Sequence, residues 1–558
     1  MIISGRKYRY GDQMFTVIPA NILHTTNVVS TIYTPVSEIR KFLSEHREKP
    51  YICCEYAHAM GNSCGAFLKY IQLTEDDPLY QGGFIWDYID QAIACRDRYG
   101  RAYLGYGGDF NDRPHDGNFS GNGIVYGDTR TPSPKMQEVR NGYQSIRVSL
   151  ETKPAGAGAK ENTAAEITAV IKNKFLFTST DRFDCVITLA EEDRELSRVK
   201  TVVSVKPQEE KRISLPIVIP AVSGEAVVTV SFLTREDAPW APEGTEIAWA
   251  QKTIAPERKA VPEEKALGGK MKVVEGAVNL GVAGEHFHVL FSNLHGGLVS
   301  YVYAGRELLK TSPRPNFWRA MTDNDKGCLF PMRAGQWRQA GFFATTISQE
   351  ERNVTDYKVS ISEDLVTVTY TYHLATMPAK DCLVTYTVKP DGEISVRMQM
   401  DASREVGELP EFSMLFLLDA DNDHLRWYGA GPEETYLDRR NGKIGVYRTT
   451  VEKCMAGYLR PQECGNHTDV RWAEVTDGLG RGLRFRVNGL QFSALPYTPE
   501  ELECASHPNE LPKTVHTCVR VGLQMGVGGD DFWGSQVHPE YRLDNTKPME
   551  IAFSFKGI

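Results

Sequence analysis

The pattern of hydrophobic residues changes near residue 145, and this change constrains the fold more than any other feature of the chain. Before it, short apolar runs alternate with segments of helical periodicity. The apolar runs are residues 27–33, 51–54 and 83–86, and the helical segments are residues 36–46 and 66–73. A β-α-β-α-β order favours parallel strands joined by crossover helices. We therefore predict an α/β region over residues 1–145.

Downstream of residue 150 the periodicity is that of β-strands. Residues 152–162 and 255–270 carry proline, glycine and charge, and they predict two linkers. Between the linkers, four short alternating runs favour an immunoglobulin-like β-sandwich over residues 146–256. A larger β-sandwich is predicted over residues 270–558, where strict alternation continues. The runs of the two regions are residues 166–171, 184–189, 200–205 and 227–232, then 365–370, 383–388, 394–400, 483–487 and 551–555.

Length and composition narrow the class of protein. The 558 residues fit three or four domains at about 150 residues each. A net charge of −9 argues against a nucleic-acid partner, and no stretch approaches the roughly 20 apolar residues of a membrane helix. The first residues lack the apolar core of a signal peptide. Eleven cysteines with no C-x-x-C pair favour a reducing cytoplasm over a disulfide framework or a zinc site.

One motif, CEYAHAMGNS at residues 54–63, carries most of the chemical information. Glu55 directly follows a predicted buried strand and precedes a Gly/Asn/Ser turn into a helix. In a parallel α/β barrel the C-terminal ends of the strands carry catalytic residues, so Glu55 occupies the position of a nucleophile. The residues alone leave a second interpretation open, in which Glu55 caps the following helix.

The neighbouring motifs favour the catalytic interpretation. CEYAHAMGNS, QGGFIWDYIDQ and YGGDFND resemble glycoside hydrolase family 2, in particular its large bacterial β-galactosidases of the lac-operon type. The likeness is nearly continuous from about residue 25 to residue 128. It resumes at FWRA (317–320), DND (323–325), GAGPE (429–433) and GVGGDDFW (526–533). The resemblance implies that residues 1–145 are the C-terminal half of a TIM (β/α)8 barrel and that residues 270–558 are a sandwich of β-galactosidase small-chain type.

By the same resemblance, three residues near the first strand ends have roles in catalysis. Glu55 matches the nucleophile of a retaining enzyme that hydrolyses terminal β-D-galactosides such as lactose through a covalent galactosyl-enzyme. Tyr33 matches a tyrosine that hydrogen-bonds this nucleophile, and His58 matches a histidine that hydrogen-bonds the sugar. Without the family, Tyr33 is equally a packing residue at a strand end, and His58 a histidine bonded to backbone at a helix start.

Four further residues match ligand-binding positions. Trp86 matches the tryptophan beneath the galactose ring, and Trp533 one that a C-terminal loop brings over the aglycone side. Phe119, through its carbonyl, and Asn122, through its side chain, match a sodium site, and a hard cation takes such oxygen ligands. The family also binds Mg²⁺, but its ligands match no residue of this chain and are expected upstream.

Two further segments in the C-terminal region match the family but are not assigned a role in binding or catalysis. Asp530 and Asp531 are interpreted as turn and capping residues. Residues 323–327 match a mobile family loop near the site entrance. The family carries a glutamate three residues after Gly327, where this chain has Phe330.

A retaining glycosidase needs a second carboxyl about 5–5.5 Å from the nucleophile, acting as general acid. The family places it in an Asn-Glu pair more than forty residues before the position of Tyr33. Only 32 residues precede Tyr33 here, and they contain no such pair. Other carboxylates near strand ends match no family acid, and we expect them to cap helices or orient neighbours. They are Asp87, Asp90, Asp109 and Asp112.

The sequence thus predicts the C-terminal portion of a β-galactosidase, inactive alone and active with a complementary N-terminal chain. One alternative is a non-catalytic galactoside-binding or scaffold protein, and another is a different family 2 β-glycosidase, such as one acting on glucuronides. A homo-oligomer is compatible with the family.

Overall fold

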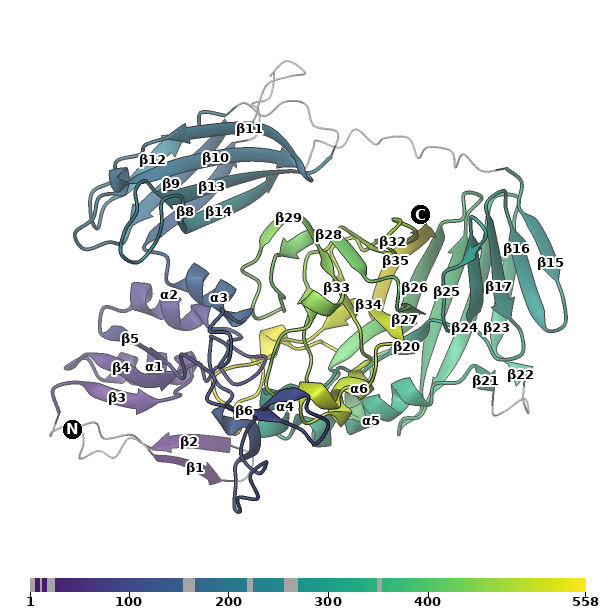
Figure 1. Ribbon diagram of the computed structural model, residues 1–558, viewed down its shortest axis with the longest axis horizontal. Coiled ribbons are helices and arrows are strands. Elements are labelled where there is room, and N and C mark those ends of the chain that lie inside the picture. Colours follow the sequence, from purple (N-terminus) through teal and green to yellow (C-terminus); the bar gives the residue numbers. More distant parts are fainter. Residues whose placement is uncertain are drawn as a thin grey trace. The chain divides into compact units, whose positions relative to one another are not determined.

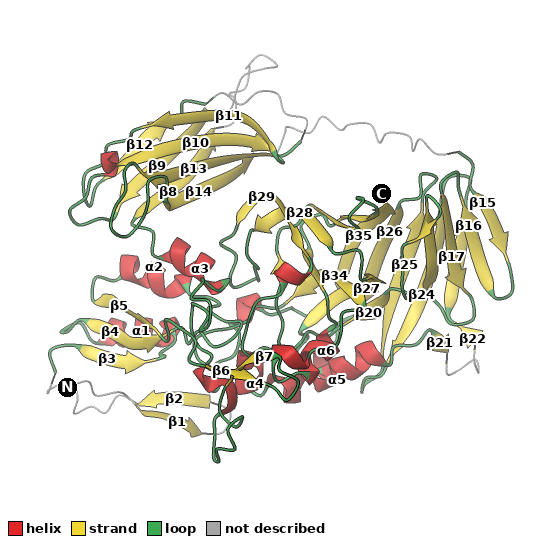
Figure 2. Cartoon of the chain, viewed as in Figure 1, coloured by secondary structure: helices red, strands yellow, loops and turns green. Residues whose placement is uncertain are grey.

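The computed structural model describes residues 6–10, 13–17, 26–153, 166–217, 224–254, 269–348 and 354–558 (Figures 1 and 2). The chain forms two compact units. One contains residues 1–138, 265–442 and 447–558, and the other contains residues 139–264 and 443–446. None of the described helices combines the length and the apolar character that crossing a membrane requires.

The predicted β-α-β-α-β segment is confirmed. It begins after a hairpin of β1 (Arg6–Tyr10) and β2 (Gln13–Val17), and its strands β3, β4 and β5 form a parallel sheet in that order. The three strands are Val29–Ile32, Tyr51–Tyr56 and Tyr80–Ile85, and the connecting helices are α1 (Val36–Glu45) and α2 (Leu68–Asp76). Each helix buries apolar residues at helical spacing, among them Ile39, Leu43, Tyr70 and Leu73.

The parallel arrangement continues beyond β5. Residues 87–90 run beside residues 122–125, with a parallel bridge between Ile89 and Val125. A hairpin of β6 (Ile93–Arg96) and β7 (Ala102–Gly105) lies between these segments in the sequence, and α3 (Lys135–Gly142) follows them. These residues therefore extend the α/β region that the sequence predicts.

The second unit contains the smaller β-sandwich. One sheet has the order β12-β9-β8 and the other β11-β10-β13-β14, with antiparallel pairing throughout. The strands are β8 Ile146–Lys153, β9 Glu166–Asn173, β10 Phe183–Glu191, β11 Arg194–Thr201, β12 Glu210–Ser214, β13 Ala226–Thr234 and β14 Glu246–Ile254. Most of both predicted linkers, residues 154–162 and 255–268, lies outside the described residues.

One predicted strand of this sandwich is wrong. The prediction covers residues 200–205, but β11 ends at Thr201. Val203 and Val205 are buried, so their side chains give the alternation of a strand. Their backbone groups bond instead to Thr180, whose hydroxyl donates to the Val203 carbonyl (2.6 Å) and accepts from the Val205 N–H (2.9 Å).

Among the described residues, the C-terminal region is a larger β-structure with three large sheets, in the orders β15-β16-β17-β18-β19, β20-β27-β34-β33-β30 and β23-β24-β25-β26-β35-β32-β31-β28-β29, and a small two-stranded sheet, β21-β22. Strand β24 buries every second residue, as its sequence alternation predicts. The strands are β15 Lys272–Glu275, β16 Asn279–Ala283, β17 Phe287–Ser292, β18 Leu298–Tyr303, β19 Arg306–Glu307, β20 Arg314–Asn316, β21 Ile347–Ser348, β22 Val354–Thr355, β23 Tyr357–Ile361, β24 Val366–Leu374, β25 Lys380–Val388, β26 Ile394–Met400, β27 Glu411–Asp419, β28 His424–Gly431, β29 Lys443–Thr450, β30 Asn466–His467, β31 Trp472–Thr476, β32 Gly482–Arg486, β33 Gln491–Leu495, β34 His516–Gln524 and β35 Met549–Gly557.

Three α-helices accompany these sheets. They are α4 (Asp323–Gly327), α5 (Phe330–Phe342) and α6 (Pro499–Cys504). The segment 323–327, expected as a loop, forms α4 because Thr322 and Asp325 make a capping box that starts a helix. Phe330, at the position of the family glutamate, is buried at the start of α5 in the apolar core.

Candidate active site

Glu55 lies at the C-terminal end of β4, at the edge of the sheet where the sequence places a catalytic residue. Its backbone pairs with Ile32 of β3, and the backbone N–H of Tyr33 donates to the Glu55 carbonyl (2.8 Å). Strand pairing thus fixes Glu55 beside Tyr33. The Glu55 side chain is half-buried.

Tyr33 contacts Glu55 through its side chain as well. Its hydroxyl hydrogen-bonds the Glu55 carboxyl, and the ring is buried. Burial, and next the negative charge of Glu55, raise the pKa of Tyr33 far above its usual value. The phenol therefore stays protonated at neutral pH and can donate to the carboxylate. The backbone of Tyr33 has a φ of +48°, unusual for a bulky residue, so its surroundings hold it in place.

His58 lies at the centre of an aromatic cluster that joins distant parts of the chain. Its ring stacks on Phe119 with centroids 5.3 Å apart and meets the edge of Trp533 at 5.2 Å. Tyr33 meets His58 at 5.7 Å and Trp533 at 4.9 Å, both edge to face. Four of the residues singled out in the sequence therefore converge here. Phe532, which the sequence did not single out, also joins the cluster, 5.9 Å from Phe119.

The ring nitrogens of His58 are buried, and neither has a hydrogen-bond partner among the described residues. Burial lowers the pKa of His58 to about 4, so the imidazole is neutral at pH 7. Buried polar atoms in native proteins nearly always find a partner. An open donor and an open acceptor inside an aromatic cluster suit a bound hydroxyl group.

Trp86 joins the site through its backbone. Its N–H donates to the Tyr56 carbonyl (3.3 Å), and its carbonyl accepts from the Ala59 N–H (2.7 Å). Trp86 directly follows β5, and the residue is 38% exposed. Trp86 therefore flanks the segment that carries Glu55 and His58 and is partly exposed.

The segment that follows Glu55 is buried but irregular. Residues 56–67 are all buried, and Ala57, Gly61, Cys64 and Ala66 have φ values between +49° and +60°. A segment without regular structure must find partners for its backbone groups elsewhere, and such backbone conformations persist only when the surroundings impose them. The contacts around residues 56–67 therefore determine where Glu55 and His58 lie.

A buried lysine supplies the first of these contacts. Lys135, at the start of α3, donates to the carbonyls of Ala59 (2.6 Å) and Gly61 (2.9 Å). Burial lowers the pKa of Lys135 from its usual value. Its ammonium group thus holds the turn after His58 through two backbone carbonyls.

The C-terminal sandwich supplies the remaining contacts. The Arg439 guanidinium donates to the Ser63 carbonyl (2.6 Å), and the Asp438 carbonyl accepts from the Ala66 N–H (2.7 Å). The side-chain oxygen of Gln462 accepts from the Asn62 N–H (3.1 Å). Partners some 400 positions away in the sequence therefore shape the turn that follows the candidate nucleophile.

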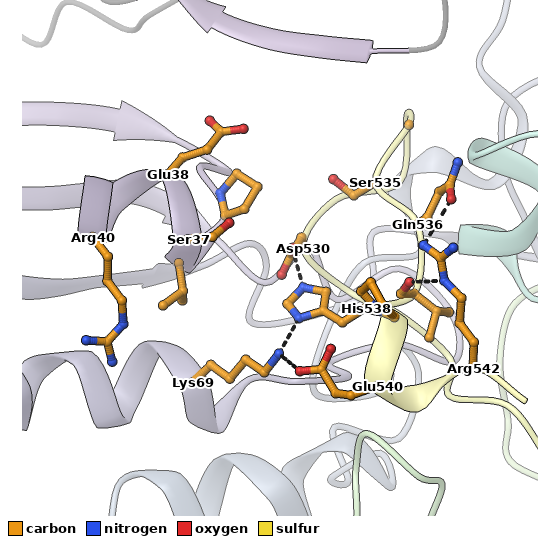
Figure 3. Close-up of a pocket in the computed structure, with 15 residues that line it drawn as sticks. Ser37, Glu38, Arg40, Lys69, Asp530, Ser535, Gln536, His538, Glu540 and Arg542 are labelled. Carbon is orange, nitrogen blue, oxygen red and sulfur yellow. Dashed lines mark hydrogen bonds and ion pairs between the residues drawn. The ribbon is translucent and has the colours of Figure 1, made fainter. Parts of the chain in front are cut away.

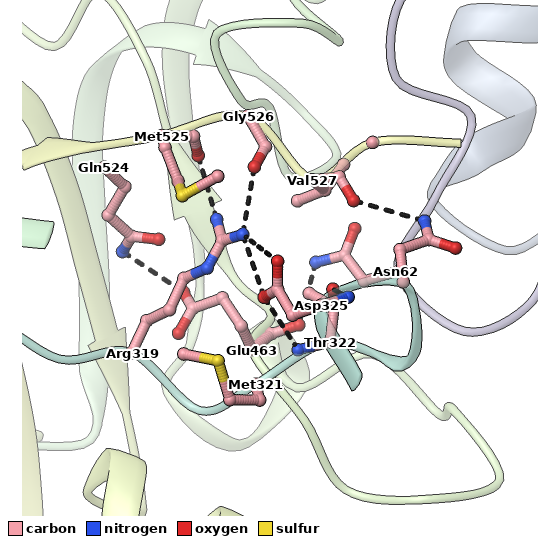
Figure 4. Close-up of polar contacts among 12 residues, drawn as sticks. Asn62, Arg319, Met321, Thr322, Asp325, Glu463, Gln524, Met525, Gly526 and Val527 are labelled. Atoms are coloured by element: carbon pink, nitrogen blue, oxygen red, sulfur yellow. Dashed lines mark hydrogen bonds and ion pairs between the residues drawn. The ribbon is translucent and has the colours of Figure 1, made fainter. Parts of the chain in front are cut away.

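A buried polar cluster lies behind these contacts (Figure 4). Arg319 is fully buried and donates to Asp325 of α4 and to the carbonyls of Met525 (2.8 Å) and Gly526 (2.9 Å). Asn62 donates to the Glu463 carbonyl (2.8 Å). The cluster thus fixes α4, the segment leading to Trp533 and the turn after His58 to one another.

Gly61 offers a test of this packing. A Cβ atom there would lie 2.4 Å from Asp323 Oδ2 and 2.5 Å from Gln462 Oε1, at a φ of +53°. We expect Gly61→Ala to destabilise the chain by about 1–3 kcal/mol in urea unfolding. Gly117→Ala is the matched control, since Gly117 has a φ of +59° with no atom near its Cβ position. Equal losses in the two variants would mean that the crowding at Gly61 is absent.

The aspartates near strand ends have structural partners. Asp90 accepts from the Gly123 N–H (2.8 Å), and Asp109 lies 2.9 Å from His507 Nε2. Asp87 accepts from Gln91 (2.8 Å), and Asp112 accepts from the Gly108 N–H (3.0 Å). These contacts agree with the expectation that they orient neighbours.

The two aspartates before Trp533 differ from each other. Asp531 accepts from the N–H groups of Trp533 (3.0 Å) and Ser535 (2.9 Å), and this is the expected turn role. Asp530 instead points into the molecule, where it contacts Tyr70 and His538. The turn interpretation is therefore wrong for Asp530.

Three family models match successive parts of the chain. They are the glycosyl hydrolases family 2 TIM barrel domain at residues 7–148, β-galactosidase domain 4 at residues 169–255, and the β-galactosidase small chain at residues 283–556. The chain belongs to glycoside hydrolase family 2. Within that family it corresponds to the C-terminal portion of the β-galactosidases.

Curated relatives extend the match. A β-galactosidase of Halalkalibacterium halodurans is 41% identical over 543 residues, covering 96% of this chain and 51% of that protein. The β-galactosidases of Priestia megaterium (38% identity, 96% and 50%) and Streptococcus thermophilus (37%, 92% and 48%) match similarly. The chain spans about half the length of these relatives.

Proposed function

We propose that this chain is the nucleophile-bearing part of a retaining β-galactosidase that hydrolyses terminal β-D-galactosides such as lactose. The observation that carries the proposal is the Glu55 carboxyl at a barrel strand end, hydrogen-bonded by a protonated Tyr33. Beside it lies His58, whose two ring nitrogens have no partner among the described residues. The relatives named β-galactosidase support the choice of sugar.

The proposed chemistry has two steps. A Glu55 oxygen attacks the anomeric carbon and forms a glycosyl ester, while the bond to the aglycone oxygen breaks and that oxygen takes a proton from a general acid. Water then attacks the same carbon, gives up a proton to the base formed from that acid, and releases the Glu55 carboxylate. Tyr33 donates to the carboxylate, orients the attacking oxygen and stabilises the anion that departs in the second step.

The aromatic residues supply binding. Neutral His58 offers one donor and one acceptor to sugar hydroxyls, which suits a group that must not carry charge into the site. Trp86 and Trp533 present indole faces, on which the apolar face of a galactoside packs. These roles are those that the family resemblance assigns to Trp86 at the galactose and to Trp533 at the aglycone.

A sodium ion fits the residues proposed to hold it. The Asn122 side-chain amide lies 3.1 Å from the Phe119 carbonyl, and Asn122 Oδ1 is buried without a partner among the described residues. Rotating the Asn122 amide by 180° would bring its Oδ1 next to the Phe119 carbonyl oxygen. A hard cation such as Na⁺ is bound by oxygen ligands of this kind. The proposed ligands are the Phe119 carbonyl oxygen and the Asn122 amide oxygen.

Removing sodium tests this assignment. In an active enzyme containing this chain, we expect replacement of Na⁺ by tetramethylammonium to raise the KM for a nitrophenyl β-galactoside several-fold. Asn122→Leu should raise the KM in Na⁺ and abolish the difference between the two salts. An Asn122→Leu enzyme that still responds to Na⁺ would place the ion elsewhere.

The general acid is proposed to come from a complementary N-terminal part. Asp87, Asp90, Asp109 and Asp112 of this chain already have hydrogen-bond partners, as described above. The β3-β4-β5 sheet also has exposed apolar side chains on and beside its outer strands, with Phe84 65%, Tyr88 64% and Val28 40% exposed. Further barrel strands would cover such residues.

A graft tests the proposal directly. This chain would replace the aligned half of the Halalkalibacterium halodurans β-galactosidase, and hydrolysis of nitrophenyl β-galactoside, lactose and nitrophenyl β-glucuronide would be measured. We expect galactoside turnover by the graft and none by this chain alone. Galactoside binding without turnover in the graft would favour a scaffold, and turnover of the glucuronide alone would favour another β-glycosidase.

A further inference from the structure

Tyr33 and Trp533 meet edge to face although five hundred residues separate them in the sequence. Trp533 lies in a turn between β34 and β35, so its place depends on what anchors that turn. Asp531 shapes the turn locally through the N–H groups of Trp533 and Ser535. Local bonds define the shape of a turn, and contacts to another element are needed to place it against Tyr33.

Asp530 adds two such contacts to those that Arg319 and Asp438 make with residues 525–528. The carboxylate is buried, and its Oδ1 accepts from the Tyr70 hydroxyl (3.1 Å). The same hydroxyl lies 3.1 Å from the carbonyl of Thr34, the residue that follows Tyr33. Tyr70 belongs to α2 and is buried. One phenol oxygen therefore connects the strand end of Tyr33 with the turn of Trp533.

His538 holds the other oxygen of Asp530. Its Nε2 lies 2.8 Å from Asp530 Oδ2, and its Nδ1 lies 2.7 Å from Lys69 Nζ (Figure 3). Lys69 also pairs with Glu540. An ammonium group only donates hydrogen bonds, so Nδ1 of His538 accepts from Lys69. Nε2 therefore carries the hydrogen and donates a hydrogen bond to Asp530. The chain of contacts therefore runs from α2 through His538 to the Trp533 turn.

A cavity adjoins this turn. A cavity of about 550 Å³ separates the start of α1 from residues 534–542, and its walls include Asp530, Ser535, Gln536 and His538 (Figure 3). Asp530 lines this cavity together with its partner His538.

We propose that Asp530, Tyr70 and His538 form a positioning unit that holds the Trp533 indole against Tyr33 and His58. The consequence for catalysis rests on the proposed function, in which Trp533 contacts the aglycone. The unit acts through Trp533 and touches no reacting atom. Loss of the Asp530 carboxylate is therefore expected to move the Trp533 indole while the hydrogen bond from Tyr33 to Glu55 is kept.

Fluorine NMR of the full chain labelled with 5-fluorotryptophan tests the positioning. The chain has eight tryptophans, and Trp533→Phe identifies the Trp533 resonance by its absence. We expect this resonance to shift or broaden in Asp530→Asn, Tyr70→Phe and His538→Gln, while the other seven keep their shifts. His373→Gln and Asp381→Asn are the matched controls, because these residues form a comparable pair (2.8 Å) between β24 and β25.

The outcomes separate clearly. An unchanged Trp533 resonance in Asp530→Asn would overturn the proposal. If Asp530→Asn unfolds, all eight resonances collapse together, and Tyr70→Phe, which removes a single oxygen, then decides by the same criterion. The NMR result does not depend on turnover, so an inactive graft would contradict the proposed function and leave the positioning result standing.

The active graft gives a second readout. We expect Asp530→Asn to lower kcat/KM for lactose about 10-fold or more, since small misplacements near a substrate have large effects. In a Trp533→Ala background, Asp530→Asn should have almost no effect on kcat/KM. If Asp530 acts through Trp533, the effects of the two substitutions are not additive. Additive losses would show that Asp530 acts independently of Trp533.

Discussion

Glu55→Gln is expected to remove galactoside hydrolysis from the grafted enzyme, lowering kcat by about 10⁴-fold or more. An amide oxygen cannot form the glycosyl ester, although His58 and Trp86 still bind the sugar. The change is nearly isosteric, so the KM or the binding of a thio-galactoside should stay within a few-fold of the parent. Initial rates with nitrophenyl β-galactoside measure the loss.

Glu363→Gln is the control for this variant, since Glu363 is exposed in the C-terminal sandwich and the charge change is the same. It should retain the activity of the parent. A Glu55→Gln enzyme that keeps a tenth of the parental kcat would mean that another carboxylate carries the covalent step.

The second large effect concerns stability. Arg439 is fully buried, donates to Glu434 (2.6 Å) and also holds the Ser63 carbonyl. Replacing it with methionine leaves the Glu434 charge buried without its partner. We expect Arg439→Met to lower the free energy of unfolding by about 3–5 kcal/mol, the usual size for breaking a buried ion pair. Urea unfolding of the full chain measures the change.

The neighbouring residue provides the control. Arg440 pairs with Asp469 at 2.8 Å, but its side chain is 52% exposed, and exposed pairs contribute at most about 1 kcal/mol. Arg440→Met should therefore be close to neutral. Similar losses for Arg439→Met and Arg440→Met would show that the buried pair adds no stability beyond that of a surface pair.

The backbone fold follows from the sequence where periodicity is regular. Residues 394–400 alternate strictly and form β26 with the predicted bounds. The helix predicted at residues 36–46 forms because Val36, Ile39 and Leu43 lie on one face and are buried. In both cases the local hydrophobic pattern agrees with the observed burial, so the sequence alone is sufficient to predict the element.

Hydrophobic periodicity does not predict an element whose stability comes from tertiary contacts. The sequence does not predict helix α5, since Gly335 and Gly341 weaken its helical propensity. It forms because Ala334 and Trp337 pack into the core of the C-terminal sandwich. Its stability therefore comes from residues far along the chain, which a local window does not contain.

The candidate site shows the same division. Glu55, His58 and Trp533 stand out because their motifs resemble a family, and the structure brings His58 and Trp533 together with Tyr33, the side-chain partner of Glu55. Lys135 and Gln462 were missed. Their partners are backbone groups of residues 56–67, and Gln462 lies 400 positions from Asn62, so local spacing contains no signal of the contact.

Glu55 is proposed to form the covalent bond to the sugar. This bond can be detected by mass spectrometry of peptides from the grafted enzyme after inactivation with a 2-deoxy-2-fluoro-β-galactoside bearing an activated leaving group. We expect one fluorogalactosyl adduct, on the peptide that contains CEYAHAMGNS, with fragmentation placing it on Glu55. An adduct on any other residue of an inactivated enzyme would contradict this proposal.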